Sequence, residues 1–283
     1  MSYLIASICC SVFVSVLLKV ARHYDIDVRQ AVAVNYAVAA LLCVAVLQPE
    51  LHTLQRPATP WGVLIALGFL LPSVFLAMAA SVRHAGIVRS DAAQRLSLFI
   101  PLMAAFLLFG QSLSSQTAIG IAVAFAALAC LIGRPQSGPA VQSTAGPGSW
   151  AWPLAVWLGY GVIDILFKQM ARAGTQFAGG LLAAFVLAGL VILSYLLIKR
   201  VQWSWRHAAG GLILGLANFG NILFYIRAHQ HYATDPALVF SAMNIGVITL
   251  GTLVGALFFK EKLTPRNWLG VALAIGAVVV LIP

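Results

Sequence analysis

Charged residues are scarce in this chain, and acidic residues are the scarcest. Asp, Glu, Lys and Arg make up only 8% of its 283 residues, and 7 of these are Asp or Glu. A soluble domain of this length needs a charged surface, so the composition excludes that class. The two glutamates, Glu50 and Glu261, both fall in predicted loops, so no relay of protons along buried carboxylates is expected.

Residues that could form a catalytic or metal centre are also missing. The four cysteines lie in apolar runs with neither metal-ligand spacing nor a disulfide framework, and they are Cys9, Cys10, Cys43 and Cys130. The six histidines lie near predicted helix ends without a partner at metal spacing, and they are His23, His52, His84, His207, His229 and His231. The motifs GxSxG and HExxH and the phosphate-binding loop are absent. We therefore expect a protein that is not an enzyme and holds no metal or cofactor, and an ATP-driven pump is excluded for this chain acting alone.

Hydrophobic residues fill most of the chain. They account for 61% of it, and the mean hydropathy is +0.96. Apolar runs of about 20 residues are long enough to cross the hydrocarbon core of a bilayer. The net charge of +10 is spread over short loops and forms no patch, so no nucleic-acid partner is expected. The composition predicts a multi-pass integral membrane protein that has the lipid bilayer as its surroundings. We expect this membrane to be the inner or plasma membrane of a bacterium.

Ten membrane-spanning helices are predicted. Their ranges are 3–22, 28–48, 60–83, 89–110, 115–133, 150–172, 176–199, 204–227, 236–259 and 265–283. Residues 134–149 are rich in Pro, Gly and Ser and predict a flexible linker. The linker separates a first five-helix repeat, 1–133, from a second, 150–283.

The two predicted halves resemble each other in sequence. Residues 117–133 match residues 267–283 at an offset of about 150 residues, and the turns before them align at the same offset. Near the start of each half, residues 15–22 resemble residues 164–172. Because five is an odd number, the halves must have opposite orientations in the membrane. The predicted fold is thus an all-α integral membrane protein of ten transmembrane helices in two inverted five-helix repeats, an arrangement typical of transporters.

A cluster of polar residues interrupts the apolar sequence of the sixth predicted span. Asp164 and Lys168 are four residues apart, so on a helix they share a face and can pair, and Tyr160 extends that face by one turn. Each charge inside a membrane helix costs about 2.5–3.5 kcal/mol, so such charges face a protein interior or a watery cavity. Two interpretations stay open: an ion pair that staples helices, and a substrate site near the middle of the bilayer.

Polar residues in other spans are further candidates for substrate binding. They are Lys19, Asn35, Tyr36, Gln94, Arg95, Asn218, Asn221 and Asn244. The alternative for the basic residues Lys19, Arg95 and Lys168 is that they reach a headgroup or water layer, since each lies near a helix end. The alternative for the asparagines is hydrogen bonding between helices.

Three further features concern the packing of the predicted helices. Asp91 stands four residues before Arg95 and can pair with it. Pro101 is expected to kink or loosen the fourth span. GxxxG motifs at Gly211 and Gly215, and at Gly251 and Gly255, are read as sites of close helix packing.

The last stretch of the chain resembles a known family. Residues 258–281, FFKEKLTPRNWLGVALAIGAVVVL, are similar to the typical ending of EamA-like ten-helix members of the drug/metabolite transporter superfamily. The family's Gly-Glu turn corresponds to Gly110–Gln111 and Lys260–Glu261, and this chain departs from that pair in both halves, at a turn we interpret as structural. The resemblance covers nearly the whole chain. It implies a secondary carrier that works by alternating access around a central cavity.

The charges and the resemblance together lead to a functional hypothesis. The small drug exporters of the superfamily carry a glutamate in the first helix, where this chain has Lys19 and no acid, which argues against a cationic drug. We expect a transporter of a small polar metabolite, zwitterionic or anionic and amino-acid- or sugar-like. Lys168, with Asp164 and Tyr160, would anchor its carboxylate or phosphate.

Other functions and properties stay open. The alternatives are a flippase for a lipid-linked sugar and a non-transporting membrane scaffold. The distribution of Lys and Arg among the loops puts both termini outside the cytoplasm, whereas the family resemblance implies the opposite, so the orientation is open. The substrate, the transport direction, the coupling ion and the oligomeric state, a monomer included, are not given by the sequence.

Overall fold

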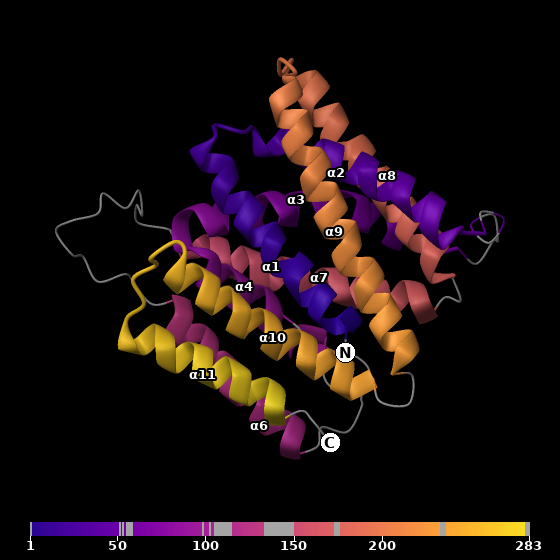
Figure 1. Ribbon diagram of the computed structural model, residues 1–283. Helices are drawn as coiled ribbons and strands as arrows, with labels where there is room; N and C mark the ends of the chain where they lie inside the picture. The colour runs from indigo at the N-terminus through magenta and orange to yellow at the C-terminus, as the bar shows by residue number, and fades with distance from the viewer. Residues whose placement is uncertain are drawn as a thin grey trace. The chain divides into compact units, whose positions relative to one another are not determined.

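The regular structure of the described part of the chain is all helical. The computed structural model describes residues 2–50, 52, 54, 59–97, 99–101, 103–104, 115–132, 150–172, 176–232 and 236–280, and no strand occurs among them (Figure 1). The α-helices are α1 (Ser2–His23), α2 (Val28–Leu42), α3 (Trp61–Ala85), α4 (Ile87–Leu96), α6 (Ser115–Ile132), α7 (Ala151–Arg172), α8 (Phe177–Ile198), α9 (Trp205–His231), α10 (Pro236–Leu257) and α11 (Pro265–Val280). A π-helix, η1 (Cys43–Leu47), continues α2. Each predicted span has a counterpart, so the all-α, ten-helix prediction is confirmed.

Many of these helices have the length and composition of membrane spans. Among the described residues, α1, α2 together with η1, α3, α7, α8 and α9 are long and apolar enough to cross a bilayer. Shorter apolar stretches occur in α6, α10 and α11. A helix suits this setting because it satisfies its own backbone hydrogen bonds where no water is present.

The fourth predicted span is interrupted close to Pro101. The helix α4 stops at Leu96, and helical structure is described again at residues 99–101 and 103–104. Proline has no N–H, and its ring clashes with the carbonyl four residues earlier, which here belongs to Ser97. That carbonyl accepts a hydrogen bond from the N–H of Ile100 at 2.9 Å instead. The predicted disruption at Pro101 therefore lies about one turn before the proline.

The chain forms two compact units, and each draws helices from both predicted halves. Unit 1 consists of Met1–Lys19, Ala77–Gly161 and Gly220–Pro283, and unit 2 consists of Val20–Leu76 and Val162–Phe219. The predicted linker, 134–149, lies outside the described residues. The division at that linker and the inversion of the halves stay predictions.

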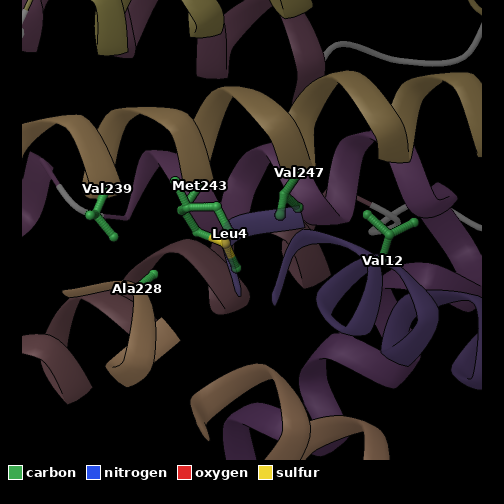
Figure 2. Close-up of a cluster of buried hydrophobic side chains, with 6 residues drawn as sticks. All are labelled: Leu4, Val12, Ala228, Val239, Met243 and Val247. Atoms are coloured by element: carbon green, nitrogen blue, oxygen red, sulfur yellow. The ribbon is translucent and has the colours of Figure 1, made fainter. Parts of the chain in front are cut away.

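Unit 1 has an apolar core built by helices from opposite ends of the chain. In Figure 2, Met243 and Val247 extend from α10 toward Leu4 of α1, and Val239 lies on the side of Ala228 of α9. All six residues of this core cluster are buried, and the cluster consists of Leu4, Val12, Ala228, Val239, Met243 and Val247. Within the same unit α11 packs beside α6 and α10 (Figure 1), and α10 also packs on α4. The core thus holds the first helix of the chain in contact with α10.

In unit 2, glycines bring helix backbones close together. The helix α2 packs on α8, and Gly211 and Gly215 of α9 face α2. A Cβ atom at Gly211 would lie 2.6 Å from the carbonyl oxygen of Ala31, and one at Gly215 would lie 3.1 Å from that of Asn35. Backbone atoms cannot move aside as side chains can, so this GxxxG motif serves close packing, as predicted from the sequence.

The contact at Gly211 gives a direct test of this packing. We expect Gly211→Ala to lower the free energy of unfolding by about 1–3 kcal/mol, because the added methyl overlaps backbone atoms of α2. The measurement is thermal unfolding of the purified variants in one detergent, followed by tryptophan fluorescence. Gly62→Ala is the matched control, because a Cβ there meets nothing within 4 Å. Equal melting temperatures for the two variants would contradict the close approach of α9 and α2.

Candidate functional site

One face of α1 carries a line of polar side chains within unit 1. Ser7, Ser11, Ser15 and Lys19 follow one another at intervals of four residues, so they lie along one face of the helix. The three serines are buried, and the side chain of Lys19 is 27% exposed. We call these four residues and their partners Asn221, Arg95, Asp91 and Glu261 the α1 polar column.

The serines of the column bond to α9 and α4. The Ser7 hydroxyl lies 3.0 Å from the backbone carbonyl of Asn221 and 2.9 Å from its Oδ1. Arg95 Nη2 donates to Ser11 Oγ at 2.5 Å, and Ser15 Oγ donates to Asp91 Oδ1 at 2.5 Å. Rising numbers on α1 thus meet falling numbers on α4, so the two helices run antiparallel along the column.

Asp91 is the most deeply buried ionisable group of the column. Its exposed fraction is 2%, and among the described residues its second oxygen, Oδ2, has no hydrogen-bond partner. The backbone of α10 covers that oxygen, because a Cβ atom at Gly251 would lie 2.6 Å from it. The spacing to Arg95 suggested an ion pair along α4, but the hydrogen bonds described for both residues are made to serines of α1.

At the other end of the column, Glu261 links the turn after α10 to α1 and to the start of α4. Its carboxylate pairs with Lys19 Nζ at 3.0 Å and accepts the backbone N–H groups of Ile87 at 2.7 Å and Val88 at 3.3 Å. These two N–H groups begin α4, where a helix has unsatisfied donors and a positive dipole end. Gly86 precedes them with φ +90°, and a Cβ atom there would lie 2.6 Å from Glu261 Oε2. Glu261 is therefore an N-terminal cap for α4 and a counter-charge for Lys19.

The turn that holds Glu261 explains the family pattern noted in the sequence. Lys260 adopts φ +50°, in the left-handed region that favours glycine. A Gly-Glu pair therefore fits this turn, with glycine for the backbone conformation and glutamate for the cap. Gly110–Gln111, the corresponding pair of the first half, lies outside the described residues.

Several predicted site residues lie in unit 1. Lys19, Arg95 and Asn221 belong to the α1 polar column. Gln94 and Tyr160 are half-buried, and Asn244 is buried. The column therefore gathers three of the predicted residues, and the role of all six in binding stays a prediction.

The other predicted site residues lie in unit 2. Asn218 Nδ2 donates to Asn35 Oδ1 at 3.1 Å, so these two amides link α9 and α2. Asn35 is fully buried, and its Nδ2 has no hydrogen-bond partner among the residues that the structure describes. Tyr36 is buried beside Phe75 and Phe185. The interaction matches the alternative interpretation of Asn218 as a link between helices.

In the described part of the chain, Asp164 and Lys168 do not form the ion pair that their four-residue spacing allows. Both side chains are exposed on α7, and none of the ion pairs among the described residues joins them. A role of Lys168 in substrate binding remains a prediction.

Sequence reasoning missed the serines of the column. The signal was present, because Ser7, Ser11 and Ser15 recur every four residues in an otherwise apolar helix and lead to Lys19. Asp91 and Glu261 were named from the sequence, but their partners in the column could not be identified, because these are distant in the sequence. Lys19 and Glu261, for example, are 242 residues apart.

Comparisons with known proteins point to one family. A model of the EamA-like transporter family matches residues 1–133. An uncharacterized protein of Haemophilus influenzae is 49% identical over 98% of this chain and 96% of its own length. A probable 4-amino-4-deoxy-L-arabinose-phosphoundecaprenol flippase subunit of Hamiltonella defensa is 30% identical over 89 residues, which is 29% of this chain and 78% of that protein. A crystal structure with 17% sequence identity covers 99% of this chain and 96% of its own, with a TM-score of 0.59, and shows the same fold.

The backbone at Lys260 predicts a stabilising substitution. We expect Lys260→Gly to raise the free energy of unfolding by about 0.5–1 kcal/mol, because glycine relieves the left-handed strain and only part of the gain is lost to unfolded-chain entropy. The thermal unfolding midpoint measures the effect. Lys260→Ala also removes the charged side chain but keeps a Cβ atom, so it should give no such gain. A gain of the same size in both variants would mean that the side chain, not the backbone, is the cause.

The carboxylate of Glu261 predicts a destabilising substitution. Glu261→Gln should lower the free energy of unfolding by about 2 kcal/mol, because Lys19 loses its counter-charge while remaining largely enclosed. Thermal unfolding at neutral pH measures the loss. Glu50→Gln changes the other glutamate of the chain, which is exposed, and should have little effect. Similar losses in the two variants would contradict a special role for the Glu261 carboxylate.

Proposed function

Because this chain belongs to the EamA-like transporter family of multi-pass membrane proteins, we propose that it is a secondary carrier that moves a small polar metabolite by alternating access. The observation that carries the proposal is the α1 polar column. Asp91 is buried, and Lys19, Arg95 and Glu261 are half-buried, although each charge inside a membrane costs about 2.5–3.5 kcal/mol. Such a cost is typical of residues on a substrate or ion pathway.

The charges of the column favour a zwitterionic or anionic substrate. Lys19 is matched by Glu261, which also caps α4, so this pair has a structural role. Arg95 donates to the neutral hydroxyl of Ser11 and has five N–H donors in a planar fork, which suits a carboxylate or a phosphate. An amino-acid- or sugar-phosphate-like metabolite would carry such a group. Lys168 on α7, with Asp164 and Tyr160, is the second candidate for the anchor.

One comparison favours a second function, a flippase for a lipid-linked sugar. The relative from Hamiltonella defensa is described as a flippase subunit for a phosphoundecaprenol-linked sugar. The phosphate of such a lipid is an anion as well, so it would meet Arg95 by the same chemistry. The two functions differ in the lipid tail, which a flippase must let pass sideways into the bilayer.

A ligand screen tests the carrier and its anchor together. Wild type, Arg95→Gln and Lys168→Gln would be heated with amino acids, sugars, organic acids, nucleotides and undecaprenyl phosphate. A compound that binds the folded protein stabilises it by about 2.7 kcal/mol at a hundredfold excess over its dissociation constant. We expect an anionic or zwitterionic metabolite to stabilise wild type and Lys168→Gln, with the effect lost in Arg95→Gln.

The controls separate the alternatives. Lys199→Gln removes an exposed charge at the end of α8 and should behave as wild type. Loss of the ligand effect in Lys168→Gln alone would move the anchor to α7. A response to undecaprenyl phosphate alone would favour the flippase. A wild type that responds to none of these classes would contradict the proposed substrates.

A further inference from the structure

The hydrogen bonds described for Asp91 engage only one of its two carboxyl oxygens. Its Oδ1 accepts from Ser15, whereas its Oδ2 has no hydrogen-bond partner in the described part of the chain and lies against the backbone at Gly251. A carboxylate can accept several hydrogen bonds, and an oxygen buried without any is costly. A purely structural acid would have both oxygens matched, as Glu261 has.

The ion pairs found among the described residues do not include Asp91. Arg95, one turn further along α4, is a nearby positive charge that interacts electrostatically with Asp91 and donates a hydrogen bond to Ser11. Glu261 is a second acid in the surroundings. Lys19 of α1 is paired with that glutamate. The helices α6 and α10, which also pack on α4, carry no charged side chain, and Arg266 of α11 donates to the carbonyl of Ala129.

A single hydroxyl group can serve Asp91 in both of its protonation states. Ser15 donates to the carboxylate, and the same oxygen can accept from a protonated carboxyl group after the hydroxyl rotates. The protonated form also removes the charge, which is the main cost of burial in an apolar setting. The geometry therefore permits reversible uptake of one proton without rearrangement of the neighbouring helices.

We propose that Asp91 is the proton-binding site of this carrier. Its carboxylate takes up one proton from the aqueous phase on one side of the membrane, becomes a neutral carboxyl group, and releases the same proton on the other side. This inference rests on the proposed function as a secondary carrier and names its coupling ion. The absence of a chain of buried acids, noted in the sequence, does not conflict with it, because one acid is enough to bind one proton.

Infrared difference spectroscopy tests the site without any substrate. The protein would be reconstituted in vesicles of phosphatidylethanolamine and phosphatidylglycerol, and spectra would be compared between about pH 8 and about pH 5. We expect a protonated-carboxyl band that appears on acidification in wild type and is lost in Asp91→Asn. Glu50→Gln is the control, because it removes an exposed carboxyl group that belongs to no proposed site, and it should keep the band.

A second variant guards against misfolding as an explanation. Ser15→Ala leaves the carboxyl group in place and removes its partner, so the band should remain and shift in frequency. A band that persists in Asp91→Asn, or no band in wild type, would overturn the proposal. Loss of the band when sodium chloride replaces choline chloride would also overturn it, in favour of a sodium site. Because these readouts need no substrate, a failed ligand screen would count against the carrier function and not against proton binding at Asp91.

Discussion

The scarcity of water inside a bilayer is the constraint that shapes this protein. A polar group in that environment must find its partner within the protein, and a charge must find another charge or become neutral. The α1 polar column shows how the chain meets this requirement. Each polar residue of one face of α1 has a partner from α4, α9 or the turn after α10. Glu261 satisfies two needs at once, since it matches Lys19 and caps α4.

Close packing depends on glycine where polar groups do not provide the contact. Gly211 and Gly215 let α9 approach the backbone of α2, and Gly251 lets α10 cover Asp91. Without water to drive apolar surfaces together, such approaches supply the dispersion contacts that hold membrane helices. At Gly251 the approach has a second effect, because it brings the backbone of α10 against Oδ2 of the Asp91 carboxyl group.

Local patterns and distant partners differ in how well the sequence predicts them. The ten spans follow from hydropathy, and the interruption near Pro101 follows from the missing N–H of proline. The partners of Lys19 and Asp91 could not be found this way, because helical spacing reveals only neighbours three or four residues apart. Asp164 and Lys168 satisfy that spacing and yet are exposed, whereas Ser15 and Asp91 are bonded across 76 residues. The serines of α1 also looked like ordinary small residues of a membrane helix.

The ion pair between Lys19 and Glu261 has a consequence for the order in which the chain is assembled. Lys19 belongs to α1, whereas Glu261 follows α10, so the two residues are 242 positions apart. Synthesis proceeds from the N-terminus at about 5–20 residues per second, so Lys19 enters the bilayer many seconds before its counter-charge exists. During that interval the lysine must stay at the headgroups or be sheltered by other proteins of the insertion machinery. The ion pair between Lys19 and Glu261 therefore forms only after α10 has been synthesised, which makes it a late contact of α1.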